Sequence, residues 1–135
     1  QKFKVTPLAQ KEPFHATKTH QMGLYLGGKW YLLEPENLKG LDARSQIDSQ
    51  LVEDRIVRGM LGMDPGDKRI AYVGGDYSPA YLQKQVDEGK FAAALSMPPM
   101  TMKEFYGINQ SRMMLPRKTT WFTPKIRSGL VIGMF

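Results

Sequence analysis

Cysteine is absent from this chain of 135 residues. Its absence excludes disulfides, thiolate metal sites and cysteine nucleophiles together, and it fits a reducing compartment such as the cytoplasm. No apolar run approaches the roughly 18 residues that a membrane-spanning helix needs, so we expect a cytoplasmic protein with no membrane partner. The chain also lacks an initiating methionine and a signal-peptide layout. We therefore expect Gln1 to be a cut inside a longer polypeptide.

Acidic residues are missing from the last 31 positions. All thirteen Asp and Glu lie at or before Glu104, where fourteen Lys and Arg leave a net charge of +1, whereas the final segment carries five cations and a charge of +5. This asymmetry favours an anionic partner, whether phosphate, carboxylate or nucleic acid. Nucleic acid is the least favoured, because the total charge of +6 is modest and no recognition-helix or RNP-like pattern occurs.

The length of residues 1–135 predicts a single domain with one hydrophobic core. Three β-strands are expected early in the chain, at residues 3–6, 20–26 and 29–34. The last two of these form a hairpin, because Gly27-Gly28 between them readily supplies the positive φ angles of a tight primed turn.

A long helix is expected at residues 42–62, with Asp42 or Ser45 capping its amino end and Gly62 ending it. At 100° per residue its apolar side chains spread around most of the circumference, whereas a surface helix usually shows one apolar stripe. Two interpretations stay open: the helix is enclosed by its own core, or it docks on missing polypeptide or on a second copy of the chain. The apolar residues are Ile47, Leu51, Val52, Ile56, Val57, Met60 and Leu61.

The middle of the chain predicts a β-α-β unit. A strand at residues 69–73 would precede a helix at 78–89, and the apolar strand 91–96 would follow. Such a unit implies two parallel strands joined by a right-handed crossover.

The final third predicts a short helix and a strand. Thr101 and Glu104 have the spacing of a capping box, and Phe105 and Ile108 are the expected core contacts of that helix, while residues 129–135 are typical of a buried strand. The fold class is therefore α+β (mixed α/β). We expect a mixed β-sheet with an N-terminal hairpin, one β-α-β unit and about three helices packed on the sheet.

Two pairs of polar residues are weak candidates for chemistry. His15 and His20 are expected to be surface or structural histidines, because a metal site would need a further ligand from elsewhere. Asp64 and Asp67 flank Pro-Gly and precede two cations, so a structural turn is favoured over an acid/base pair.

A phosphate-binding loop is a further candidate. Gly74 and Gly75 stand between a predicted strand and a predicted helix, where backbone N–H groups can cradle a phosphate. The chain has no GxGxxG or Walker pattern, and Asp76 would repel an anion, so a plain turn is the alternative.

The strongest candidate is the segment LPRKTTWFTPKIRSGL, residues 115–130. Two prolines stiffen it, its cations and hydroxyls donate hydrogen bonds, and its indole offers a stacking face. These groups suit a phosphorylated or planar anionic molecule, or a nucleic-acid strand. The alternative is that Trp121 and Phe122 are core residues and the cations only solvate an edge. The predicted ligand-binding residues are Arg117, Lys118, Thr119, Trp121, Lys125 and Arg127, together with Gly74 and Gly75.

Five segments carry a family resemblance: MGLYLGGKWYLLE (22–34), LDARSQIDSQLVEDRIVRGMLGM (41–63), GDKRIAYVGG (66–75), VDEGKFAAALSM (86–97) and LPRKTTWFTPKIRSGLVI (115–132). In this order they resemble the carboxyl-terminal part of a bacterial and archaeal family catalogued as Domain of Unknown Function 1015. The sequence departs from the family at Arg117, where a proline is frequent, at Ala71, where an acid is common, and in a shorter loop at DPGDKRI.

The resemblance implies that an amino-terminal portion of the polypeptide is a missing partner. In the family that portion carries an Asp-Gly-His-His-Arg-type motif similar to the ParB and sulfiredoxin superfamily, which includes a free-serine kinase. The longer protein would then be a small-molecule phosphotransferase using a nucleotide such as ADP or ATP with Mg. This chain, which lacks the motif, would have no activity alone and would complete a pocket for a small anionic ligand. The alternative is a module without catalytic activity that mediates protein-protein interaction or dimerisation, including formation of a homodimer.

Overall fold

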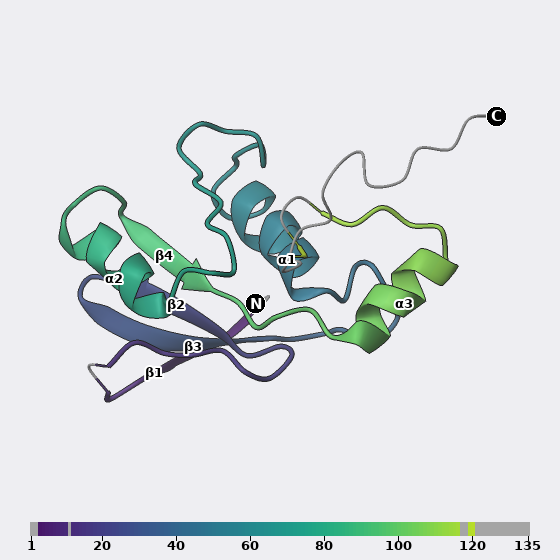
Figure 1. Cartoon of the computed structure of the whole chain (residues 1–135), viewed down its shortest axis with the longest axis horizontal. Coiled ribbons are helices and arrows are strands. Elements are labelled where there is room, and N and C mark those ends of the chain that lie inside the picture. Colours follow the sequence, from purple (N-terminus) through teal and green to yellow (C-terminus); the bar gives the residue numbers. More distant parts are fainter. Residues whose placement is uncertain (1–2, 11, 117–118, 121–135) are drawn as a thin grey trace, which may run out of the picture.

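The fold is α+β, as the sequence predicts (Figure 1). The computed structural model describes residues 3–10, 12–116 and 119–120. The strands are β1 (Phe3–Pro7), β2 (Met22–Leu26), β3 (Lys29–Pro35) and β4 (Ala93–Ser96). The helices are α1 (Asp48–Leu51), the π-helix η1 (Val52–Arg58), α2 (Pro79–Asp87) and α3 (Met102–Gln110).

The predicted hairpin is confirmed and forms the centre of the sheet. β2 and β3 pair antiparallel, and the turn residues Gly27 and Gly28 have φ angles of 58° and 77°. Only glycine adopts such angles at little cost, which explains the choice of residues in a two-residue turn. β1 adds to the outer edge of β3 and β4 to the outer edge of β2, giving the order β1-β3-β2-β4.

Two details of the predicted sheet are wrong. All pairings among the described strands are antiparallel, so the sheet is not mixed, and residues 69–73 form no strand, so the β-α-β unit is absent. The backbone N–H of Arg69 donates to the Asp67 carboxylate, and that of Ile70 donates to the Asp67 carbonyl, which bends the chain into a turn. Ile70 packs against the core from that turn, so its hydrophobicity serves the core without a strand.

One face of the sheet packs against α1 and η1. The cross-strand partners Met22 and Leu33 share this face with Phe3, and α1 and η1 pack apolar side chains against them. The resulting core cluster consists of Phe3, Met22, Leu33, Leu51, Val52 and Val57. Leu24 and Leu95, which are also cross-strand partners, extend it to β4.

The helix predicted at 42–62 is shorter and has a different pitch. It begins at Asp48 and becomes a π-helix from Val52 to Arg58, in which hydrogen bonds run between residues five apart. Val52 and Val57 are five residues apart in the π-helix and both pack in the core cluster, so its wider turn brings them to the same side. At 100° per residue, the α-helical period, these two side chains would lie on different sides of the helix. Of the two open interpretations, the core explains these residues, whereas Met60 and Leu61 beyond the helix are exposed.

The opposite face of the sheet holds α2 through two side-chain hydrogen bonds. The Tyr25 hydroxyl donates to Asp87 Oδ1 at 2.7 Å, and Trp30 Nε1 donates to Gln83 Oε1 at 2.9 Å. Tyr25 and Trp30 are cross-strand partners with ring centroids 5.1 Å apart. Gly23 lies beside them, and a Cβ there would come within 3.0 Å of the Trp30 ring, so the close packing depends on glycine.

Tyr25 makes the stability of the fold sensitive to alkaline pH. Its hydrogen bond to Asp87, together with burial, raises the pKa of Tyr25 above the ordinary value. As the pH rises above about 10, the unfolded chain loses this phenolic proton before the folded chain does, so the free energy of unfolding falls. We expect Tyr25→Phe to lose less stability than the original chain between about pH 9 and about pH 11. Urea denaturation followed by circular dichroism measures the difference, and parallel curves for the two proteins would contradict it.

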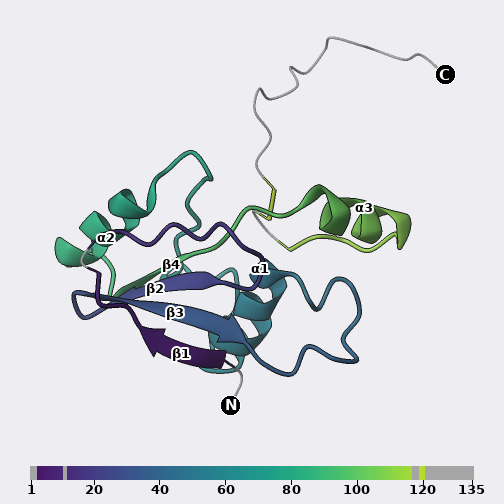
Figure 2. The same ribbon diagram turned by 90° about the horizontal axis from the view of Figure 1, so that it is seen from below.

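α3 lies apart from the sheet, at the opposite end of the molecule from α2 (Figure 2). Its start confirms the predicted capping box, because Glu104 N donates to the Thr101 hydroxyl and Thr101 N donates to the Glu104 carboxylate. Ile108 is buried as expected. The strand predicted at 129–135 lies outside the described residues.

Candidate functional site

Two cavities lie side by side along α1 and η1 and share Arg44 and Met114 in their linings. The first has a volume of about 330 Å³ and the second about 360 Å³, within the range usual for small-molecule sites. The first is lined by Asp42, Arg44, Ser45, Gln50, Asp54, Met113 and Met114. The second is lined by Arg44, Glu53, Arg58, Asp64, Pro65, Gly66, Met114, Leu115 and Pro116. We call the pair the Arg44 cleft.

A tight turn ahead of α1 positions Arg44. The Asp42 carboxylate accepts hydrogen bonds from the Ser45 backbone N–H at 2.9 Å and from the Ser45 hydroxyl at 3.1 Å. The backbone hydrogen bond is the main reason that the pKa of Asp42 lies below its ordinary value. Asp42 therefore holds this turn, and it does not cap the helix itself.

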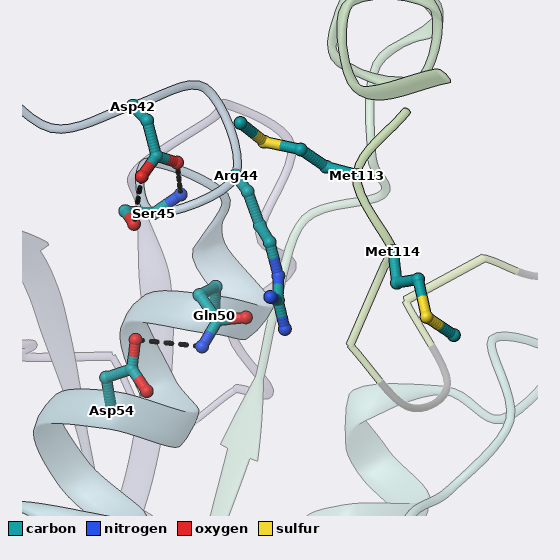
Figure 3. Close-up of a pocket in the computed structure, with 7 residues that line it drawn as sticks. All are labelled: Asp42, Arg44, Ser45, Gln50, Asp54, Met113 and Met114. Carbon is teal, nitrogen blue, oxygen red and sulfur yellow. Dashed lines mark hydrogen bonds between the residues drawn. The ribbon is translucent and has the colours of Figure 1, made fainter. Parts of the chain in front are cut away.

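Two side chains of the cleft have polar atoms without partners in the described part of the chain. Gln50 is 7% exposed, and its Nε2 donates to Asp54 Oδ2 at 2.8 Å, whereas its buried Oε1 accepts no hydrogen bond. The buried Nε–H of Arg44 is likewise without an acceptor. Figure 3 shows the Arg44 guanidinium between Gln50 and Met114, with the Gln50 oxygen on the side of Arg44. Leaving such groups unsatisfied costs about 1–3 kcal/mol each.

The second cavity contains charges that are already paired. Arg58 Nη2 lies 2.9 Å from Glu53 Oε1, and Arg58 Nε lies 3.9 Å from Asp54 Oδ1. The hydrogen bond to Glu53 raises the pKa of Arg58 above its ordinary value. Arg58 therefore has acidic partners, whereas no ion pair joins Arg44 to any other described residue.

The π-helix supplies three of the charged side chains that line the two cavities: Glu53, Asp54 and Arg58. A π-helix is rare and is frequently found at functional sites. Since its turns are wider than those of an α-helix, it changes which side chains face the same direction. The π-helix is thus an independent structural reason to regard the cleft as a site.

A buried carboxylate fixes the start of α1. Asp48 is 6% exposed and accepts from the backbone N–H of His20 at 2.9 Å, and its other oxygen lies 2.8 Å from His20 Nδ1. His20 has a φ of 64°, a conformation that non-glycine residues adopt infrequently. The pair ties the loop before β2 to the helix that carries Gln50. His20 is therefore a structural histidine, in agreement with the sequence interpretation.

Only Thr119 of the predicted basic-segment residues is described, and it serves as a structural tie. Its hydroxyl donates to the Pro116 carbonyl at 2.8 Å, so the Ser49 hydroxyl, 3.1 Å away, acts as the donor to Thr119. These contacts hold Thr119 next to Ser49 of α1 and to Pro116, and Leu115 and Pro116 line the cleft. Arg117, Lys118, Trp121, Lys125 and Arg127 lie outside the described residues.

Gly74 and Gly75 lie in the loop before α2. The strand predicted ahead of them is absent, and Tyr77 N donates to the Gly74 carbonyl at 3.2 Å. Neither glycine lines the Arg44 cleft. Their predicted role in phosphate binding stays a prediction without the strand-loop-helix geometry on which it depended.

The acids of the DPGD segment hold turns, as expected. Asp64 Oδ1 accepts from Gly66 N at 2.7 Å, and both Asp67 oxygens accept from the Arg69 guanidinium, at 3.0 and 2.7 Å. This guanidinium contact lowers the pKa of Asp67 to about 2. No group of three potential metal ligands occurs within residues 3–10, 12–116 and 119–120.

Comparison with models of protein families, with curated proteins and with solved structures finds no match for this chain. The resemblance to the Domain of Unknown Function 1015 family therefore stays a prediction. None of the helices in the described part of the chain is long and apolar enough to cross a membrane.

Proposed function

We propose that this chain is a ligand-binding domain whose Arg44 cleft takes the anionic group of a small molecule. The observation that supports it is Arg44 itself, a half-buried guanidinium shared by two cavities, with a buried Nε–H that has no acceptor among the described residues. A carboxylate or phosphate oxygen would satisfy such a donor, and charge-assisted hydrogen bonds from arginine are among the strongest in proteins.

The place of the basic segment in the chain supports the same proposal. Leu115 and Pro116 line the cleft, and Thr119 is tied to Ser49 on α1. Arg117 and Lys118 stand between them in the sequence. In the finer form of this proposal, which rests on the family resemblance, the domain completes the ligand pocket of a small-molecule phosphotransferase whose catalytic residues belong to a preceding part of the polypeptide.

Replacing Arg44 tests the proposal. Arg44→Met keeps the length and packing of the stem but removes the charge, and we expect it to weaken binding of inorganic phosphate at least about tenfold. Amide chemical shifts of the isotope-labelled chain, measured during a phosphate titration, give the affinity and the location of binding. The signals of Arg44, Gln50 and Ser49 should move.

Lys84→Met is the matched control, because it removes one positive charge from an exposed site on α2, a helix that does not line the cleft. It should leave phosphate binding unchanged. Equal loss of affinity in both variants would mean that phosphate responds only to net charge. The proposal would also be refuted if phosphate changed the amide chemical shifts only of residues outside the cleft.

A further inference from the structure

The first cavity of the Arg44 cleft is lined by more acidic than basic side chains. Its charged lining consists of two carboxylates, Asp42 and Asp54, and one guanidinium, Arg44. A purely anionic ligand would be attracted by Arg44 but repelled by both acids, although solvent weakens this repulsion because Asp42 and Asp54 are exposed. An anionic group alone therefore matches only part of this lining.

Gln50 defines a second requirement. Its Nε2 is committed to Asp54 Oδ2, which fixes the amide so that Oε1 faces the other way, toward Arg44 (Figure 3). That oxygen is a pure acceptor, 93% of the residue surface is buried, and no described group donates to it. An acceptor in this position needs an N–H or O–H donor, and an ammonium group would also gain from the nearby Asp54 carboxylate.

The remaining wall is apolar and adaptable. Met113 reaches across the opening toward the turn of Asp42 and Ser45, and Met114 lies on the far side of Arg44 (Figure 3). Met114 is 81% exposed. Unbranched thioether side chains fill irregular gaps and contact apolar ligand groups without a fixed shape. Gln50 Oε1 is itself buried, so a ligand group that donates to it must first move the side chains that cover it.

We infer that the Arg44 cleft selects a small zwitterion with an unbranched apolar tail: an anionic group on Arg44, an ammonium group on Gln50 Oε1 and Asp54, and the tail against Met113 and Met114. This inference rests on the proposed function and adds the requirement for an ammonium donor. It assigns Gln50 as the specificity-determining residue, and it gives Asp54 two tasks, orienting the Gln50 amide and attracting the cation.

Three ligands of matched size test it. L-norleucine carries the carboxylate, the ammonium and a butyl chain; hexanoate lacks the ammonium, and pentylamine lacks the carboxylate. Affinities are measured with the full chain by chemical-shift titration at constant ionic strength. We expect norleucine to bind at least about tenfold more tightly than either single-charge ligand, since each charge-assisted contact carries this much or more.

The variants separate the two contacts. Gln50→Leu should reduce norleucine affinity to the level of hexanoate and leave hexanoate unchanged, and Arg44→Met should reduce it to the level of pentylamine. Asp54→Asn keeps an acceptor for the Gln50 amide but removes the negative charge. It should therefore weaken the binding of norleucine and of pentylamine, and it should leave the binding of hexanoate unchanged. It provides the test should Gln50→Leu fail to fold. Lys84→Met should change none of these affinities.

The outcomes distinguish this inference from the proposed function. Equal affinities for hexanoate and norleucine, with both lost in Arg44→Met, would overturn the zwitterion and leave an anion site. If norleucine binds no more tightly than pentylamine, and Arg44→Met changes neither affinity, both the zwitterion and the anion site would be overturned. Absence of binding of all three ligands would overturn the zwitterion, and the phosphate titration would then decide the anion site separately.

Discussion

Trp30→Ala should lower the free energy of unfolding by about 3–5 kcal/mol, the usual cost of removing a buried aromatic side chain. Trp30 is 1% exposed at the centre of the sheet, packs on Tyr25, and joins β3 to α2 through Gln83. Its truncation would leave a cavity next to Gly23, which has no side chain that could fill it. Urea denaturation followed by far-ultraviolet circular dichroism measures the loss.

Trp30→Phe is the matched control, because it keeps an aromatic ring but removes the Nε1–H that Gln83 accepts. We expect a smaller loss of about 1–2 kcal/mol, from one missing hydrogen bond and a smaller ring. If alanine and phenylalanine cost the same, the hydrogen bond and not ring packing would dominate. An alanine variant within 1 kcal/mol of the original chain, on the scale of an ordinary surface substitution, would contradict the assigned core.

Asp48→Ala is expected to lower the free energy of unfolding by about 2–3 kcal/mol, the range for losing hydrogen bonds to a charged group. The carboxylate holds both the backbone N–H and the imidazole of His20, whose φ angle is unfavourable without that support. Its loss would release the loop before β2 and the start of α1 together. The signals of Ser49 and Gln50 should therefore shift in the spectrum of the folded variant.

Asp48→Asn separates charge from shape. The amide oxygen can still accept from the His20 backbone, and the amide nitrogen can donate to a neutral imidazole, so we expect a loss of only about 1 kcal/mol. Guanidinium denaturation at neutral pH compares the two variants. A loss in Asp48→Asn equal to that in Asp48→Ala would show that the charge, and not the hydrogen-bond geometry, fixes His20.

The hairpin and the capping box of α3 were predictable because their signals are local. Gly27-Gly28 specifies a turn type by backbone sterics alone, and Thr101 with Glu104 specifies a helix start by two reciprocal hydrogen bonds. Each signal depends on residues a few positions apart. The structure confirms both because no distant contact competes with them.

The segment 69–73 was mispredicted because its outcome depends on distant partners. Its β-prone residues could form a strand only by pairing with an edge of the sheet. The edge of β2 is instead occupied by β4. The Asp67–Arg69 turn and the contact of Ile70 with the core decide its path. The β-propensity of single residues does not show which segment of the chain will pair with a given sheet edge.

The Arg44 cleft had no motif that could have revealed it. Arg44 lies in an ordinary helix-start sequence, and its role follows from the meeting of that turn with Met113 and Met114, about seventy residues later. The five-residue spacing of the buried Val52 and Val57 fits the π-helix, but two residues are too few to predict one. At the α-helical period of 100° per residue they appear only as part of an apolar spread.

The π-helix also predicts how the chain responds to insertions and deletions. Loops usually tolerate a changed length, whereas one residue removed from Val52–Arg58 would replace the i→i+5 spacing of the π-helix by the i→i+4 spacing of an α-helix. Asp54, which lines the first cavity, and Arg58, which lines the second, would then point in different directions relative to each other, although both side chains would still be present. Among related chains, those that keep the length of this stretch are the ones in which the same ligand chemistry should be sought.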